Sequence, residues 1–433
     1  MYIECTNRER ELGLEVFYTS TPGIGGRLRA TPEDFRVEEI SDFPEVADDG
    51  RYTIATVTSA NWETNRLIRQ LSRALGISRS RVGFAGTKDK RAVTTQLMSF
   101  EAPPEEVMAL SIHQVTIDGA YRSRRRVTIG DLIGNAFVVT VSDCQIGGEA
   151  LQDRCSRVIS ALMELGGFPN FFGIQRFGSM RPVTHLVGQH IVRGEMEEAA
   201  MTYVAHPTPY EMEESRAARE ELERTGDFRE ALRNFPINLT FERVMLGHLA
   251  ENPGDFAGAI GRLPSNLQMM FVHAYQSQLF NRILSERIRR GLPLDRPLVG
   301  DVVLPMTRRL IPDHEKPVPV TEENIDLVET QMKEGKAFIS GLLFGSGSDF
   351  AGGEMGEIER SVVEAEHLDQ KDFIVPPLPH CSSKGSRREL VCPLLDFGLQ
   401  AEGESATFRF KLGKGCYATS LLREYMKADP ERY

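Results

Sequence analysis

Short apolar or alternating stretches mark several strands along the chain, most of them with one face buried. These stretches are 35–38, 52–57, 82–85, 95–100, 136–141 and 407–410. Apolar residues from Leu67 to Leu75 recur instead at helical spacing, and Gly76 stands where a glycine commonly ends a helix. A charged helix is expected over 211–223 and a short helix around 421–426. Strands and helices interleave, which predicts an α/β fold.

Proline and glycine punctuate the later part of the chain. The proline-rich stretches 312–319 and 376–379 and the glycine- and serine-rich stretch 344–348 are predicted loops. The length of 433 residues favours two to three domains. No apolar run reaches the roughly eighteen residues of a membrane span, and the first ten residues are too polar for a secretory signal. We therefore expect a cytoplasmic protein with no membrane partner.

Charge is distributed unevenly. The total of −11, from 51 basic and 62 acidic residues, argues weakly against nucleic-acid binding. Between 66 and 91, however, eight basic residues accompany the single acid Asp89, and 122–126 forms a second basic cluster. Each cluster alone is also typical of a solvated surface. Together they flank one glycine-containing turn, so we expect them to follow a phosphate backbone.

Several well-known chemical motifs are missing from the sequence. It contains no complete dinucleotide fingerprint, phosphate-binding P-loop, His-Glu-x-x-His motif or Gly-x-Ser-x-Gly elbow. Its six cysteines form no Cys-x-x-Cys pair, so a zinc ribbon is disfavoured and reduced thiols are expected. If the protein is an enzyme, we expect it to work with side chains alone, without a metal or cofactor.

The segment 84–96 has the most unusual local composition. Asp89 lies there among Lys88, Lys90 and Arg91, on a predicted turn after a predicted strand. Nearby cations favour an ionised carboxylate, which can serve as a nucleophile or a general base. The alternative is a charged hairpin in which Asp89 only offsets its neighbours.

Six blocks of this sequence resemble the TruD family of pseudouridine synthases. The signature block is Gly86, Lys88 and Asp89 followed by Thr94 and Gln96. The others are 32–39, 134–137, 169–178 (with Phe171 where the family has tyrosine), 274–281 and 415–424 (with Cys416 where the family has serine). They run from residue 32 to 424 in the family's order, and jointly they are highly specific.

The resemblance implies a fold and a domain arrangement. It implies an α/β (α+β) pseudouridine synthase catalytic domain with a mixed, mostly antiparallel sheet, built from residues 1–170 and 381–433. The inserted α/β TRUD domain would occupy 171–380. It also implies a cytoplasmic enzyme with no cofactor, no metal and no obligatory protein partner.

The resemblance further implies a reaction and a substrate. A TruD-like enzyme isomerises uridine to pseudouridine in tRNA, typically uridine 13 in the D-arm, although some relatives also modify other RNAs. The essential group would be Asp89. A carboxylate can attack C1′ of the ribose or take the proton from C2′ to give a glycal, and the sequence does not choose between these routes.

Substrate-binding roles also follow from the resemblance. Phe137 would stack on the extruded base, and Asn135 would hold Asp89 or the uracil edge. Each has an ordinary alternative, as a core strand residue and a turn residue. Lys88 and Gln96 belong to the signature block, and Arg176 would contact phosphate unless it forms a salt bridge at a domain junction.

A basic partner for Asp89 is expected as well. Other synthases place a buried Arg or Lys in the closing block, where this sequence has Thr419. Arg29 aligns with a lysine of TruD relatives and is the first candidate, with Arg423 as its competitor.

Two rival functions stay open. One is a catalytically silent RNA-binding protein on the same fold, and the other is an RNA hydrolase that uses Asp89 as a base. Replacing Asp89 with Asn separates them, because only an enzyme loses turnover while it still binds RNA.

Overall fold

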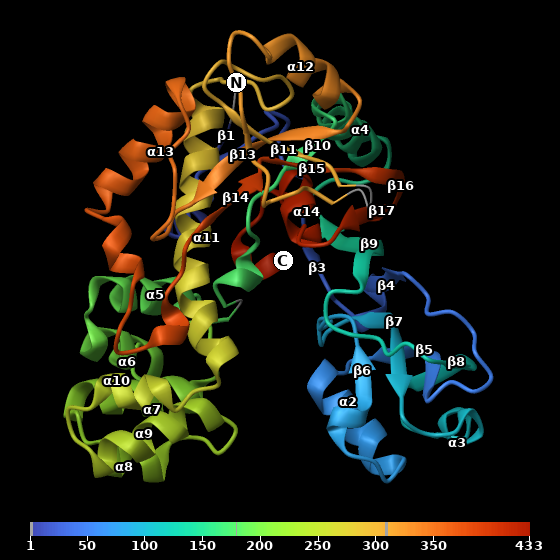
Figure 1. The fold of residues 1–433 in the computed structure, drawn as a ribbon, viewed down its shortest axis with the longest axis vertical. Helices are drawn as coiled ribbons and strands as arrows, with labels where there is room; N and C mark the ends of the chain where they lie inside the picture. The colour runs from blue at the N-terminus through green and yellow to red at the C-terminus, as the bar shows by residue number, and fades with distance from the viewer. Residues whose placement is uncertain (1–2, 179, 308–310) are drawn as a thin grey trace. The chain divides into compact units, whose positions relative to one another are not determined.

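The computed structural model describes residues 3–178, 180–307 and 311–433 (Figure 1). The chain forms two compact units. The sheet unit comprises Thr21–Phe168, Cys392–Ala428 and Arg432–Tyr433. The helical unit comprises Met1–Ser20, Pro169–Val391 and Asp429–Glu431. Two short strands, β10 (Gly167–Pro169) and β15 (Val391–Pro393), lie where the chain passes from one unit to the other.

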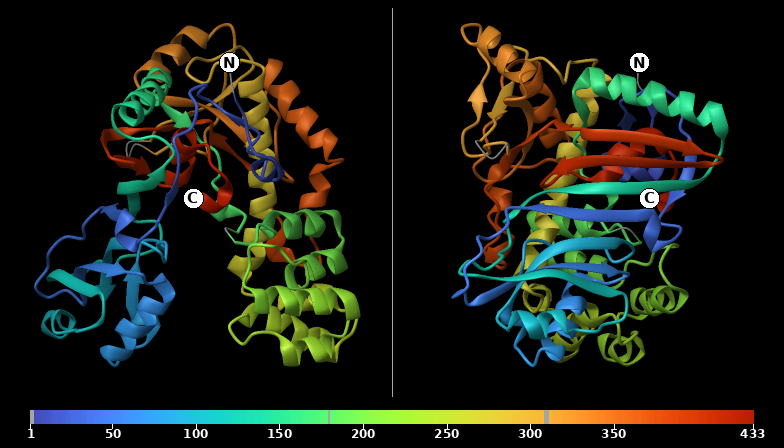
Figure 2. Two further views of the ribbon diagram at one scale, coloured as in Figure 1. Left: turned by 180° about the vertical axis from the view of Figure 1, so that it is seen from behind. Right: turned by 90° about the vertical axis from the view of Figure 1, so that its right-hand side faces the viewer.

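The sheet unit is built on a nine-stranded sheet, whose strands lie side by side in Figure 2. Its strands are β3 (Gly25–Leu28), β4 (Phe35–Ser41), β5 (Tyr52–Ala60), β6 (Val82–Phe84), β7 (Val93–Phe100), β8 (Val115–Ser123), β9 (Leu132–Cys144), β16 (Leu395–Glu402) and β17 (Ser405–Gly413). The main path runs β16-β17-β9-β4-β7-β5-β8, with β3 beside β9 and β6 beside β7. Only β4 and β7 pair in parallel, whereas the other pairs are antiparallel.

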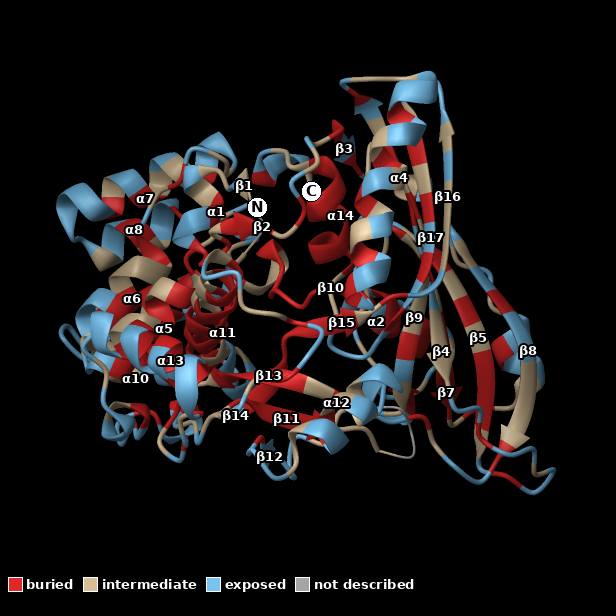
Figure 3. Cartoon of the chain, turned by 90° about the horizontal axis from the view of Figure 1, so that it is seen from above, coloured by how far each residue is buried: buried red, intermediate tan, exposed pale blue. Residues whose placement is uncertain are grey.

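Helices cover this sheet. They are α2 (Thr64–Ala74), α3 (Pro104–Met108), α4 (Gly148–Leu165) and α14 (Ala418–Met426). The apolar face of α2, with Leu67 and Leu71, packs on Val57 and Phe100 of the sheet. Buried residues alternate with more exposed ones along β5, β9 and β17 (Figure 3). This alternation places one face of each strand in the core.

The helical unit contains a four-stranded antiparallel sheet and most of the helices. The bounds of its elements are β1 (Ile3–Glu4), α1 (Asn7–Glu11), β2 (Val16–Phe17), α5 (Thr184–Arg193), α6 (Met196–Val204), α7 (Glu213–Thr225), α8 (Phe228–Asn234), α9 (Thr240–Glu251), α10 (Phe256–Gly261), α11 (Ser265–Arg289), β11 (Val302–Pro305), β12 (Val318–Pro319), α12 (Ile325–Lys333), β13 (Ala337–Leu343), α13 (Gly353–Ala365) and β14 (Ser386–Glu389). The sheet runs β12-β11-β13-β14.

Helix α11 is the central element of the helical unit. It packs against α5, α13 and β13 (Figure 1). Its buried positions include polar and charged residues, and Arg287 pairs with Asp301 at 2.5 and 2.9 Å with both side chains buried. A helix buried on most sides is typical of the core of a large unit. Among the described residues, no helix is both long enough and apolar enough to cross a membrane.

The predicted strands and the predicted mixed, mostly antiparallel sheet are confirmed. The helix expected from Leu67 to Leu75 is α2, and Gly76 follows it with φ +65°, as a glycine at a helix end does. The charged helix is α7 and the last helix is α14. Part of one expected loop, Val318–Pro319, is instead the short edge strand β12.

The packing boundaries do not coincide with the predicted domain boundaries. Residues 3–20 pack with the helical unit, where Gln278 and Ser285 of α11 donate hydrogen bonds to the backbone of Glu11 and Gly13. Residues 381–391 do the same because β14 pairs with β13. The division into a catalytic domain and an inserted domain stays a prediction.

Candidate active site on the sheet unit

The loop between β6 and β7, residues 85–92, carries Asp89. The hydroxyl of Thr64, the first residue of α2, accepts a hydrogen bond from the Lys88 amide at 2.8 Å. Arg91 donates a hydrogen bond to the carbonyl of Ala30 at 3.2 Å. These contacts fix the loop on both sides of Asp89, whose side chain stays 49% exposed.

Lys88 ties the Asp89 loop to strand β4 through an ion pair. Its Nζ lies 2.6 Å from Oε2 of Glu39 on β4, and the two side chains are only 5% and 1% exposed. The hydroxyl of Ser41 also donates to Glu39. A buried ion pair of this kind holds two chain segments in one register, which makes Lys88 a positioning residue for Asp89. Its predicted contact with the substrate stays a prediction.

Arg29 follows β3 and reaches Asp89. Its Nη2 lies 2.7 Å from Oδ2 of Asp89, and its side chain is 13% exposed. The guanidinium carbon lies 4.2 Å from the ring centroid of Phe35, and the backbone of Arg29 has φ +56°. A charge-assisted hydrogen bond and an aromatic contact therefore hold the arginine against the carboxylate. Arg423, the competing candidate, is buried on α14, and its guanidinium lies 4.0 Å from Glu424.

Two residues of β9, Asn135 and Phe137, lie on the same face of the sheet as Glu39. Asn135 is paired with Glu39 and Phe137 with Val37, so both side chains share that face. The ring of Phe137 stacks on Phe410 with 5.2 Å between centroids and is 8% exposed. The residue before Asn135 is Gly134. A larger residue does not fit there, because its Cβ would lie 2.4 Å from the carbonyl oxygen of Leu412 on β17.

Gln96 joins the same face from β7. It lies two residues after Thr94, which is paired with Val37 of β4. Its side chain is buried, and its Oε1 has no hydrogen-bond partner among the described residues. Oδ1 of Asn135 and Nε of Arg29 are also buried atoms without a hydrogen-bond partner among the described residues. The described residues contain eight buried side-chain atoms without a partner, and three of them belong to residues that the resemblance assigned to substrate binding.

Arg176 belongs to the helical unit. Its Nε donates to Oγ of Ser277 at 3.1 Å, and its guanidinium carbon lies 5.6 Å from the ring centroid of Phe172. The other six predicted site residues, Arg29, Lys88, Asp89, Gln96, Asn135 and Phe137, all lie in the sheet unit. Among the described residues, no three His, Cys, Asp or Glu side chains converge to hold a metal ion.

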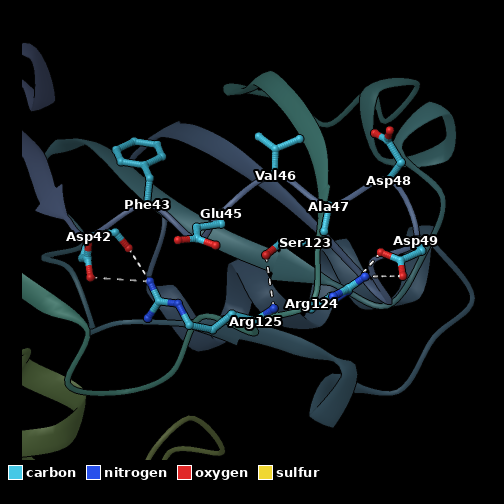
Figure 4. Close-up of a pocket in the computed structure, with 10 residues that line it drawn as sticks. All are labelled: Asp42, Phe43, Glu45, Val46, Ala47, Asp48, Asp49, Ser123, Arg124 and Arg125. Atoms are coloured by element: carbon cyan, nitrogen blue, oxygen red, sulfur yellow. Dashed lines mark hydrogen bonds and ion pairs between the residues drawn. The ribbon is translucent and has the colours of Figure 1, made fainter.

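Two of the four arginines in the basic cluster 122–126, Arg124 and Arg125, lie against carboxylates (Figure 4). Arg124 bonds both carboxylate oxygens of Asp49, at 3.0 and 2.6 Å, and this contact lowers the pKa of Asp49. Arg125 donates to the carbonyl of Asp42 and lies 3.4 Å from Asp131. The hollow of about 730 Å³ at this place has four acidic and two basic residues in its wall. It is therefore a poor match for phosphate, contrary to the expectation for this cluster.

The outer face of α2 is a better match for a phosphate backbone. Arg66, Arg69 and Arg73 are exposed at helical positions i, i+3 and i+7. No carboxylate of the described chain lies within 4.0 Å of any of them. This helix starts at Thr64, whose hydroxyl also holds the Asp89 loop, so the first turn of α2 lies beside that loop.

Sequence reasoning missed two of the positioning residues. Glu39 lies at the end of the 32–39 block, but nothing in that block indicates that it pairs with Lys88. Thr64 acts through a backbone hydrogen bond of the loop, a contact for which the sequence carries no signal.

Comparisons with known proteins agree on one family. A family model described as tRNA pseudouridine synthase D (TruD) matches residues 11–425. The "Probable tRNA pseudouridine synthase D" of Methanococcoides burtonii is 44% identical over 98% of both chains, and that of Halobacterium salinarum is 40% identical over 98% of both. A crystal structure of a TruD protein from Methanosarcina mazei covers 100% of both chains with a TM-score of 0.86 and 41% identity.

Proposed function

Because the chain belongs to the tRNA pseudouridine synthase D (TruD) family, and is thus an isomerase, we propose that its substrate is uridine 13 in the D-arm of tRNA and that Asp89 is its catalytic residue. The predicted catalytic domain, residues 1–170 and 381–433, would carry out the reaction. The predicted inserted domain, residues 171–380, would help to hold the RNA.

The reaction exchanges one glycosidic bond for another. In one route an oxygen of Asp89 bonds to C1′ while the C1′–N1 bond breaks and its electron pair leaves with uracil. In the other route Asp89 takes the C2′ proton, the C1′–N1 bond breaks, and a glycal forms beside the uracil anion. In both routes the base turns, C5 bonds to C1′, the C5 proton is lost and N1 gains a proton. The carboxylate is regenerated in the first route, and C2′ regains its proton in the second.

The observation that carries the proposal is the Arg29–Asp89 pair together with two buried, unpartnered oxygen atoms in the same unit, Oδ1 of Asn135 and Oε1 of Gln96. An ionised carboxylate held by an arginine suits either route. The Asn135 Oδ1 and Gln96 Oε1 atoms accept hydrogen bonds, and uracil offers an N–H donor to them. Phe137, backed by Phe410, supplies an aromatic surface for a base removed from its stack.

The direct test is incubation with unmodified tRNA without added metal or cofactor. Carbodiimide labelling and primer extension then map any pseudouridine. We expect one new pseudouridine at position 13. Modification of another uridine would contradict the site, and no modification despite tight binding would favour the silent RNA-binding protein.

The Arg29–Asp89 contact gives a prediction of its own. Arg29→Met is expected to lower single-turnover activity about 10²-fold, because a displaced catalytic group costs a factor of that order. Arg29→Lys is expected to recover part of the loss, since it keeps the charge but not the forked geometry.

Arg27→Met is the matched control, because Arg27 lies on β3, two residues before Arg29, and pairs at the surface with Asp143. Equal activities of the Arg27 and Arg29 variants would remove Arg29 from the mechanism.

A further inference from the structure

A second hollow, of about 360 Å³, lies within the helical unit. Two of the blocks singled out in the sequence meet in its wall. Phe172 and Arg176 come from the 169–178 block, and Ser277 comes from the 274–281 block. Lys384 closes the wall from the segment before β14. The reaction proposed for Asp89 uses none of these residues.

The charge of this hollow is one-sided. The ionisable residues of its wall are Arg176, His273 and Lys384, and none of the described residues in the wall is acidic. Lys384 is exposed, and no carboxylate of the described chain lies within 4.0 Å of it. Burial and the charge of Arg176 lower the pKa of His273, which favours its neutral form in the free protein.

The frame around these groups is fixed by hydrogen bonds. Ser277 accepts a bond from Nε of Arg176 at 3.1 Å and donates one to the carbonyl of His273 at 2.7 Å. Gln276 donates to the Phe344 carbonyl at 2.6 Å and to Ser383 at 3.0 Å, which ties the Lys384 segment to α11. The basic groups therefore project from a built site rather than from a loose surface.

The turn that follows Lys384 requires glycine at position 385. Gly385 has φ +77°, and a Cβ there would lie 2.5 Å from the Leu343 carbonyl oxygen. Only glycine fits this turn without displacing backbone, so the turn holds Lys384 at one defined point.

We propose that this hollow binds one backbone phosphate of the RNA substrate, through the charges of Arg176 and Lys384 and a proton taken up by His273. The inference rests on the proposed function only in taking RNA as the ligand. It gives the helical unit a defined anchor on the RNA that is independent of base identity, as phosphate contacts are.

The test compares Lys384→Met with the wild-type protein. The affinity for unmodified tRNA is measured over about 50 to 200 mM salt, and the slope of log affinity against log salt is expected to fall by about one unit. Lys371→Met is the matched control, since Lys371 is an exposed lysine of the same unit outside the hollow. An unchanged slope in Lys384→Met, or an equal fall in Lys371→Met, would overturn the proposal.

A second readout uses His273. The charge of Arg176 lowers the pKa of His273, and Lys384 is the other described cation in the wall, so the arriving anion is what raises that pKa. Binding then takes up a proton, and the affinity for tRNA is expected to rise as pH falls from about 7.5 to about 6, around the ordinary histidine pKa. His273→Gln should flatten this rise. A rise of the same size in the variant would exclude His273 from the site.

Inorganic phosphate separates the two sources of the anion. At constant ionic strength, it is expected to compete with tRNA no better than chloride does. The opposite result is that phosphate weakens tRNA binding to wild type more than chloride does, but not to Lys384→Met. That result would mean that the hollow prefers free phosphate, against the proposal.

Turnover keeps the two proposals apart. If the protein forms pseudouridine but the salt slope of Lys384→Met equals that of wild type, the phosphate site is contradicted and the proposed function is not. If the salt slope falls in Lys384→Met but the protein forms no pseudouridine, the proposed function is contradicted and the phosphate site is not.

Discussion

Asp89→Asn is expected to abolish pseudouridine formation, by about 10⁴-fold or more, while tRNA binding stays within a few-fold of wild type. Loss of one essential catalytic side chain has effects of this size in other enzymes. Asparagine has almost the same shape as aspartate, and its oxygen still accepts the hydrogen bond that Arg29 donates to Oδ2. The amide is, however, neither a useful nucleophile nor a base.

Single-turnover conversion of labelled tRNA measures the first effect, and a salt series of binding constants measures the second. Asp143→Asn is the matched control, because Asp143 is also an exposed aspartate paired with an arginine, Arg27. A protein that binds RNA and makes no pseudouridine with or without the substitution would be the silent binder. RNA cleavage that disappears in Asp89→Asn would identify the hydrolase.

Lys88→Met is expected to lower the free energy of unfolding by about 3 to 5 kcal/mol. The substitution leaves the buried carboxylate of Glu39 without its cation, and an uncompensated buried charge costs about that much. Activity should fall with stability, because Lys88 adjoins Asp89 in the loop that Thr64 holds. Denaturant unfolding followed by circular dichroism gives the stability measurement.

The double variant Lys88→Met/Glu39→Gln is expected to regain most of the lost stability, since it removes the stranded charge. Lys90→Met is the control on the same loop, where the side chain is exposed. A single variant as stable as wild type would mean that water reaches Glu39. A double variant no better than the single one would mean that packing, rather than charge, sets the cost.

How much the sequence predicted depends on the range of the contacts. The strands and α2 follow from local periodicity, so their positions could be read from a few residues each. The pairing of Lys88 with Glu39 joins residues 49 apart across a parallel strand pair, and no local pattern carries it. The positive charge of the cluster 122–126 can be read from the sequence, but Asp49, the carboxylate that pairs with Arg124, lies 75 residues earlier.

The candidate site divides in the same way. Asp89 was singled out because its neighbours in the sequence are cations, and the resemblance supplied Arg29, Asn135 and Phe137. The contact between Arg29 and Asp89, and the shared sheet face of Asn135 and Glu39, depend on strand register. Register follows from which faces are buried together, and that is settled only when the whole sheet is assembled.

The pairing of β9 with β17 constrains how the protein is made in the cell. Phe137 faces Phe410, which the ribosome adds 273 residues later, as the difference of the two numbers gives. At about 5 to 20 residues per second, β9 waits roughly 15 to 55 seconds for its partner. An unpaired strand edge invites wrong partners in that interval, so chaperone cover during synthesis would aid the yield of this chain. Catalytic competence should also wait for β17, because β17 carries the ring behind the proposed base platform.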